Sequence, residues 1–109
     1  MPDAKRHTII ALANRIERVG GSHRAIDWDI AQLLGGHTPI LYTGSIDAAL
    51  TLIPSTWRLM RLCECPDAVW QCAIQAREGL AQKAQINYAA TGPLAICAAA
   101  LRARAEELE

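Results

Sequence analysis

The stretch WRLMRLCECPDAVWQC, residues 57–72, constrains the fold more than any other part of the chain. In its first nine residues, every second side chain falls on the same side of an extended strand. Pro66-Asp67 is typical of a type I turn, in which proline is favoured at the second position. Residues 69–74 then predict a return strand. The stretch therefore predicts an antiparallel hairpin.

The spacing of side chains in this hairpin also predicts its register. We expect Leu59 opposite Ile74 and Cys63 opposite Trp70. Apolar residues would then occur on both faces of the sheet. We therefore expect helices to pack on both faces.

Apolar residues recur at helical spacing in the first third of the chain. Residues 4–19 predict a first helix, which Gly20-Gly21 ends with a left-handed turn. Ser22 belongs to the residue types that cap helices, and it predicts a second helix over residues 23–34. Two helices joined by a short glycine turn form a corner.

The middle of the chain predicts one more short helix. Gly35-Gly36 ends the second helix, and Pro39 disfavours a helix in the segment that follows. Ser45 then caps a helix over residues 46–52.

The last third predicts a strand and a long helix. Residues 76–83 favour either a short helix or a turn, and we expect a turn followed by a third strand over residues 84–91. Thr91 or Gly92 then caps an Ala-rich helix that Pro93 opens.

These elements predict a single domain over residues 1–109. Its fold class is α/β (α+β), a helix–sheet–helix sandwich with a small antiparallel sheet, N-terminal helices and a C-terminal Ala-rich helix. The chain has no Phe and much Ala, so a modest core of Leu, Ile, Ala and Trp is expected. Such a core often gains stability by association, so we expect a homo-oligomer.

Charge and hydropathy exclude several classes of partner. The 11 basic and 11 acidic residues cancel, which gives no overall field toward nucleic acid or an anionic membrane. No apolar run approaches the roughly 18 residues of a membrane helix, and no secretion signal is expected at the start. The four cysteines are therefore expected to be reduced thiols in a cytoplasm.

The cysteines of the hairpin are candidate metal ligands. Cys63 and Cys65 would share a strand face, with Cys72 on the neighbouring strand, and His7, His23 or His37 could complete a tetrahedral zinc site. A single intervening residue in a regular strand does not match the knuckle turns of structural zinc sites. We expect small buried hydrophobic residues, with no metal and no cofactor.

Nucleophilic catalysis would require a particular set of residues. A nucleophilic Ser or Cys needs a base within reach and a third group that holds the base. No GxSxG motif occurs, and the adjacent pairs His7-Thr8 and His37-Thr38 would point their side chains apart on a strand. We expect no catalytic residues and no enzyme activity.

Two binding sites remain as candidates. In the first, amide groups at the start of the second helix, with Ser22, His23 and Arg24, would hold an anion, although these residues also suit the end of one helix and the cap of the next.

The two helices joined by a glycine turn could also be a helix-turn-helix that binds DNA. That interpretation is disfavoured, because Asp27 and Asp29 on the second helix would face the phosphates.

The second candidate is a stacking surface on the hairpin. Trp57 and Trp70 would share a sheet face with Arg61, with Arg58 and Arg77 nearby. Aromatic rings beside arginines hold nucleobases and their phosphates. The alternative is that both tryptophans fill the core.

Two blocks of the chain, YTGSIDAALTLIPSTW and ATGPLAICAAALRARA, are similar to a known family. They resemble the phage ABA-sandwich proteins, small products of tailed phages and prophages. The matching features are Ser45, the run Asp47-Ala48-Ala49, Pro54, Trp57, Thr91 and Cys97. The family tends to place proline directly after the threonine, whereas Gly92 intervenes in this chain. The resemblance implies a helix–sheet–helix sandwich of phage origin and supplies no catalytic residue.

The resemblance to the phage proteins and the candidate binding residues together predict a function. We expect a phage-encoded anti-defence protein that acts without catalysis in the host cytoplasm by sequestering an immune signalling nucleotide. The alternative is a protein-binding inhibitor or scaffold that blocks a host defence complex and has no small ligand.

Overall fold

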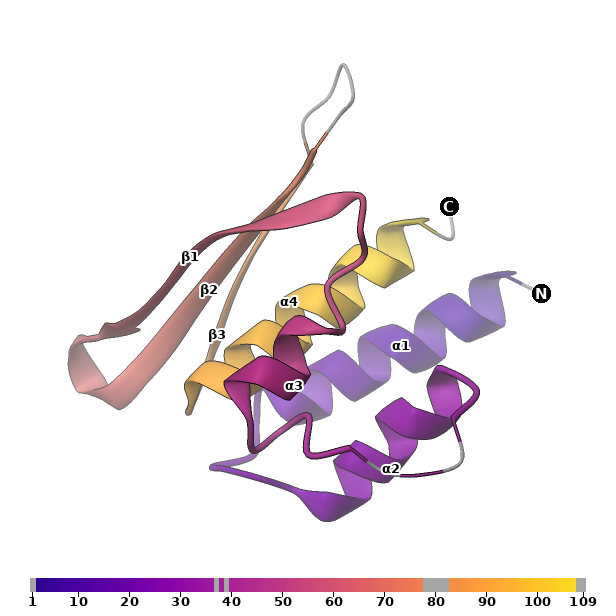
Figure 1. The fold of residues 1–109 in the computed structure, drawn as a ribbon, viewed down its shortest axis with the longest axis horizontal. Helices are drawn as coiled ribbons and strands as arrows, with labels where there is room; N and C mark the ends of the chain where they lie inside the picture. Colours follow the sequence, from indigo (N-terminus) through magenta and orange to yellow (C-terminus); the bar gives the residue numbers. More distant parts are fainter. Residues whose placement is uncertain (1, 37, 39, 78–82, 108–109) are drawn as a thin grey trace.

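A computed structural model of the chain describes residues 2–36, 38, 40–77 and 83–107 (Figure 1). His37, named above as a candidate metal ligand or catalytic residue, lies outside the described residues, as does most of the turn expected before the third strand. The helices are α1 (Pro2–Ile16), α2 (Arg24–Leu33), α3 (Ile46–Leu50) and α4 (Gly92–Glu107). The strands are β1 (Trp57–Cys65), β2 (Val69–Ala76) and β3 (Ala84–Ala89), with a 3-10 turn at Pro66–Ala68.

The mixed α and β fold, its antiparallel sheet, and the order of helices, sheet and helix along the chain are confirmed. In space, α4 is the middle layer (Figure 1). It contacts all three strands on one side and α1 and α3 on the other. A helix enclosed in this way must be apolar all round, and residues 94–101 of α4, all of them apolar and 0% exposed, meet that requirement.

The helix ends follow the sequence in most places. Ser45 caps α3, because its Oγ accepts a hydrogen bond from the amide of Ala48 (3.3 Å), and Thr91 caps α4 in the same way. Gly35 has a positive φ of 79°, as expected of a glycine that ends a helix. The expected left-handed stop at Gly20-Gly21 is wrong, because neither glycine has a positive φ.

The cap of α2 is also a correction. Its N-cap is His23, not Ser22: the imidazole Nδ1 accepts a hydrogen bond from the amide of Ile26 (3.3 Å). An unprotonated ring nitrogen therefore accepts here the amide hydrogen bond that a Ser or Asp side chain accepts at other helix starts.

The sheet order is β1-β2-β3, antiparallel throughout. The expected pairing of Leu59 with Ile74 is confirmed, but the other half of the hairpin is displaced by one residue. The register shifts between Leu59 and Arg61, so that Met60 is an extra residue in β1. An extra residue exchanges the two faces of a strand beyond it, since side chains alternate with a period of two.

The turn of the hairpin is not type I. Asp67 (φ 73°) and Ala68 (φ 59°) both adopt the left-handed conformation, whereas a type I turn has a negative φ at both central residues. Asp tolerates this conformation through its short polar side chain, but for Ala it costs about 1 kcal/mol.

A helix covers one face of the sheet, and the expectation of helices on both faces is not met among the described residues (Figure 1). The uncovered face carries Ile86 and Tyr88, which are 57% and 51% exposed. Strand pairing defines this open sheet face: Arg58, Arg61, Cys63, Cys65, Val69, Gln71, Ala73, Gln75, Ala84, Ile86 and Tyr88. It includes two arginines and no carboxylate.

None of the helices in the described part of the chain has both the length and the hydrophobicity needed to cross a membrane.

Candidate functional site

The expected stacking surface on the hairpin is not formed. Trp57 and Trp70 lie on the face that α4 covers, while Arg61 pairs with Ala73 on the open sheet face. Arg58 pairs with Gln75 on that same open face. The extra residue in β1 is the physical reason, because it reverses the side of the sheet on which Arg61 lies.

Neither tryptophan offers an open ring. Trp57 is 3% exposed, so at most an edge of its indole can meet a ligand. Trp70 is half-buried, and a Cβ placed on Gly92 would lie 3.4 Å from its ring, so the indole packs on the first turn of α4. Stacking of a nucleobase on these rings is therefore not available in this structure.

The expected anion cradle at Ser22, His23 and Arg24 is occupied by the protein's own contacts. The His23 amide donates to Oγ1 of Thr43 (2.8 Å), and the Ile26 amide donates to the His23 imidazole. The carboxylate of Asp27 is buried in the same first turn, where it would repel an anion. The side chains of Ser22 and Arg24 are exposed and are not drawn together around a cavity.

The buried Asp27 joins α2 to the segment before α3. Its Oδ1 accepts hydrogen bonds from both the amide and the hydroxyl of Thr43, each at 2.8 Å. The other oxygen, Oδ2, has no hydrogen-bond partner among the described residues. The cluster is structural, because both residues are 1% exposed and border no cavity.

All four cysteines are free thiols. Cys63 and Cys65 lie on the open sheet face, whereas Cys72 lies on the opposite face, against α4. Burial raises the pKa of Cys72 to about 11 and also raises that of Cys97, which keeps both protonated and weak as nucleophiles or metal ligands. No group of three or more potential metal-binding side chains occurs in the described ranges.

The described histidines have no role that points to catalysis. His7 is exposed on α1, and Nδ1 of His23 is engaged as the cap of α2.

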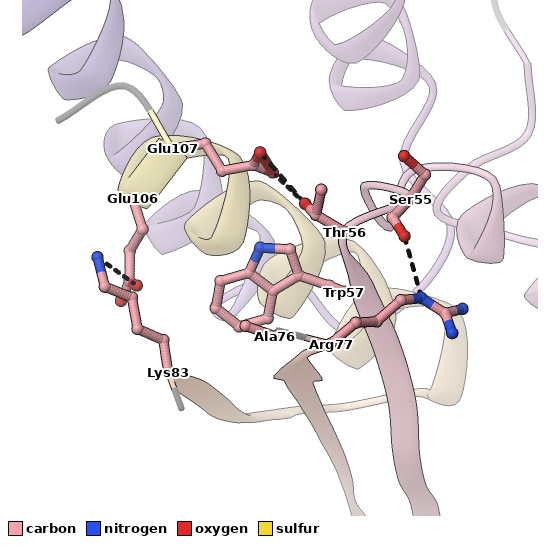
Figure 2. Close-up of a pocket in the computed structure, with 8 residues that line it drawn as sticks. All are labelled: Ser55, Thr56, Trp57, Ala76, Arg77, Lys83, Glu106 and Glu107. Atoms are coloured by element: carbon pink, nitrogen blue, oxygen red, sulfur yellow. Dashed lines mark hydrogen bonds and ion pairs between the residues drawn. The ribbon is translucent and has the colours of Figure 1, made fainter. Parts of the chain in front are cut away.

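One cavity does gather side chains of varied chemistry (Figure 2). Its volume is about 420 Å³. It lies where the C-terminal end of α4 meets the start of β1 and the end of β2. The lining residues are Ser55, Thr56, Trp57, Ala76, Arg77, Lys83, Glu106 and Glu107. We call it the Trp57 cavity.

Local contacts hold the polar groups of the Trp57 cavity in place. The Thr56 hydroxyl lies 3.2 and 3.3 Å from the two carboxylate oxygens of Glu107. Nε of Arg77 donates to the carbonyl of Ser55 (3.0 Å). These neutral partners fix the two charged groups without neutralising them.

The charges of Lys83 and Glu106, which also line the cavity, largely compensate each other. Nζ of Lys83 lies 3.8 Å from Oε2 of Glu106, and Gln85 donates a hydrogen bond to Oε1 of the same carboxylate. The two charges that lack a charged partner are therefore the guanidinium of Arg77 and the carboxylate of Glu107, among the described lining residues.

Trp57 forms the inner wall of the cavity. Figure 2 shows its indole nitrogen turned toward the side from which Glu106 and Glu107 extend. This N–H has no hydrogen-bond partner within the described part of the chain. The nitrogen is not one of the buried side-chain atoms that lack a partner among the described residues, so it reaches the open space of the cavity and can donate to a ligand.

Sequence reasoning named Trp57 as a ligand-binding residue, placed Arg77 near it, and missed the other lining residues. They come from the segment before β1, the end of β2, the start of β3 and the end of α4, and no sequence spacing links these four places. Only the tertiary fold brings them together.

Comparison with family models, curated proteins and solved structures gives no match to this chain. The resemblance to the phage ABA-sandwich proteins therefore stays an expectation, and a functional proposal has to stand on the geometry described above.

Proposed function

We propose that the protein is a non-catalytic binding protein that holds a small nucleotide-like ligand in the Trp57 cavity. In the phage setting that the sequence resemblance implies, it acts in the host cytoplasm by sequestering an immune signalling nucleotide. The observation that carries the proposal is the cavity itself: about 420 Å³, with an unpartnered indole N–H, a guanidinium and a carboxylate. Cavities of roughly 300–1,000 Å³ are typical of small-molecule sites.

The charges of the cavity support a ligand that carries an anionic group and a polar planar group. Arg77 offers terminal nitrogens to a phosphate, because its contact with the described residues is through Nε, which donates to Ser55. Glu107 and the Trp57 N–H offer an acceptor and a donor to the edge of a base. Sequestration requires no chemical step, so binding groups of this kind are sufficient.

Native mass spectrometry tests the proposal. Protein purified gently from a bacterial host is measured alone and with a panel of linear and cyclic nucleotides. We expect a mass increase of one nucleotide per 11.8 kDa chain, lost in Arg77→Ala and retained in Arg18→Ala, an exposed arginine outside the cavity. A chain that binds none of the nucleotides contradicts the proposal.

A second candidate function is favoured by the open sheet face. We propose, as the alternative, that this face binds a host protein with an apolar centre and an acidic rim. Exposed Ile86 and Tyr88 supply apolar contact area, and Arg58 and Arg61 supply positive charge without a neighbouring carboxylate on that face.

One double variant distinguishes the two candidate functions. Arg58→Glu combined with Arg61→Glu reverses the charge of the open sheet face without touching the Trp57 cavity. If the protein acts through this face, the folded double variant loses a partner that wild-type protein retains on an affinity column, while nucleotide binding is unchanged. Arg18→Glu, on the far helix layer, is the matched control.

A further inference from the structure

We infer that Cys63 and Cys65 form a binding site for copper(I), a soft monovalent metal ion. The pair lies on the open sheet face, beside the β1–β2 turn, and is separate from the Trp57 cavity. The inference therefore goes beyond the proposed function. Thiolate sulfurs are soft ligands, which bind copper(I) in preference to hard cations such as magnesium and calcium.

These two cysteines differ from the other two in their exposure. Cys72 and Cys97 are buried, as expected of cysteines that act as small hydrophobic residues. Cys63 and Cys65 are only half-buried, and no described helix covers their side of the sheet. Figure 1 shows the β1–β2 turn, where β1 ends at Cys65, extending beyond the helices. An ion in solution can therefore reach both sulfurs.

The spacing of the pair suits a bridging ion better than a disulfide. Cys63 and Cys65 are two positions apart in β1, so their side chains project in parallel from Cα atoms about 6.7 Å apart. A disulfide requires Cβ atoms about 3.5–4.5 Å apart, which parallel side chains at this spacing do not reach without distortion of the strand. Two bonds of about 2.3 Å, the length of a zinc–thiolate bond, join sulfurs about 4.6 Å apart when the bridge is linear.

The two thiols already influence each other. Burial raises the pKa of the Cys65 thiol, and so do the charge and the hydrogen bond of Cys63, whereas Arg61 lowers it. Two adjacent thiolates repel each other, and a positive ion between them removes that repulsion. Binding releases both thiol protons, so two thiolates and one copper(I) ion carry a single net negative charge. The guanidinium of Arg61, which lies on the same face, compensates this charge.

Two thiolates are sufficient for copper(I) but not for zinc. Zinc in structural sites takes four ligands in a tetrahedron. Within the part of the chain that the structure describes, no third Cys, His, Asp or Glu joins the pair in a possible metal-binding group. Cys72, on the neighbouring strand, lies on the opposite face of the sheet. Copper(I) is stable with two sulfur ligands in a line, so the pair alone completes its coordination.

Gln71 and Tyr88 position the sulfur of Cys63. The three residues form a row across the sheet, because Gln71 pairs with Cys63 of β1 and with Tyr88 of β3. Sγ of Cys63 donates to Oε1 of Gln71 (3.7 Å), and Nε2 of Gln71 donates to the Tyr88 hydroxyl (2.9 Å). A half-turn of the amide would present its N–H to a thiolate and its oxygen to the hydroxyl, which donates as well as accepts. Gln71 is therefore a positioning residue that can stabilise both the thiol and the thiolate.

Anaerobic titration of the reduced full chain with copper(I), in competition with a coloured copper(I) chelator, tests the inference. We expect one ion per chain and a thiolate-to-copper charge-transfer absorption in the ultraviolet. Cys63→Ser and Cys65→Ser should each weaken binding about 10²–10⁴-fold, since the remaining thiolate loses its linked partner. Cys72→Ala keeps both thiols of the open sheet face and should bind as the wild-type chain does. Circular dichroism confirms that each variant is folded.

Gln71→Leu tests the positioning role. It should keep the stoichiometry of one ion per chain and weaken binding about tenfold, as does removal of other groups that orient a metal ligand. Gln75→Leu makes the same change four positions further along β2 on the same face, and it should leave the affinity for copper(I) unchanged.

Several results would overturn the inference. Copper(I) binding that is unchanged in either single cysteine variant, or that is lost in folded Cys72→Ala, would assign the ion to other ligands. Zinc that displaces copper(I) at equal concentration would overturn the choice of ion. A folded wild-type chain that binds no copper(I) would overturn the site itself. Nucleotide binding in the Trp57 cavity is a separate measurement, so the two proposals can fail independently.

Discussion

Asp27 shows how much a single buried polar residue can contribute. One of its oxygens accepts both hydrogen bonds that Thr43 can donate, and the pair is sealed from solvent. Asp27→Ala would leave the amide of Thr43 buried without a partner, and its hydroxyl with only the longer contact to the carbonyl of His23 (3.3 Å). We expect the free energy of unfolding to fall by about 3 kcal/mol, measured by urea denaturation. Asp29→Ala, which removes an exposed ion pair with Arg15, should cost less than about 1 kcal/mol.

If Asp27→Ala lowers the free energy of unfolding no more than Asp29→Ala does, the Asp27–Thr43 hydrogen bonds do not stabilise the packing of α2 against the segment before α3.

Cys72 gives the protein a pH dependence at alkaline pH. Its pKa rises from 9.0 to about 11 in the fold, because burial disfavours the thiolate. Between these pH values, the unfolded chain loses this proton while the folded chain keeps it. The contribution to stability is therefore fully present below about pH 9 and is lost as the pH rises through 11.

The measurement is urea denaturation at several pH values from 8 to 11, given the pKa of about 11. We expect the free energy of unfolding to fall across this window, and to fall less steeply in Cys72→Ala. Contributions of other titrating groups cancel when the two slopes are compared. Parallel slopes would show that the thiol is more accessible to water than the structure indicates.

Among the helices, α4 depends most on the size of its side chains. It lies between the sheet and two helices, and its alanines are buried on all sides. Ala99 is 0% exposed, so the added carbon atoms of Ala99→Leu must displace neighbouring atoms of the core. We expect a loss of about 1–3 kcal/mol or more, whereas the same change at Ala11, exposed on α1, should be nearly neutral.

Urea denaturation of Ala99→Leu and Ala11→Leu side by side checks this expectation. Equal stability of the two variants would mean that α4 is not tightly enclosed, and the three-layer arrangement would then need revision.

For the molecule as a whole, Glu17 ties the layers together. One of its oxygens accepts from Arg102 of α4 (2.6 Å), and the other accepts from Asn87 of β3 (2.9 Å). These partners lie 85 and 70 residues away in the chain. Because the contacts are partly buried, Glu17→Ala should lower the free energy of unfolding by about 2 kcal/mol.

Arg15→Ala, which removes an exposed ion pair in the last turn of α1, should have less than half this effect in the same denaturation experiment. Similar losses in both variants would mean that the contacts of Glu17 with Arg102 and Asn87 add nothing to stability beyond those of an exposed ion pair.

Association into a homo-oligomer stays a prediction. Light scattering during size-exclusion chromatography should give a multiple of 11.8 kDa, and a mass of one chain would contradict it. The open sheet face, with exposed Ile86 and Tyr88, offers apolar contact area to a second copy, in an arrangement that keeps the arginines of the two copies apart.

Much of the architecture could be predicted from local signals. The strand bounds of β1, the confirmed caps Ser45 and Thr91, and the long last helix all follow from short-range patterns of alternation, capping and propensity. Such signals act between residues a few positions apart, and they are present in the sequence itself.

The candidate site could not be predicted in this way. The extra residue Met60 moves Arg61 away from Trp70, and no local pattern marks it, since either register satisfies the alternation of apolar residues on both faces. Likewise, Thr56, Arg77 and Glu107 converge on Trp57 only after α4 has packed against the sheet. The sequence by itself determined which elements form, because those choices depend on neighbours along the chain. The tertiary structure alone decided which faces those elements bury and which charges meet, because these depend on contacts between residues far apart in the chain.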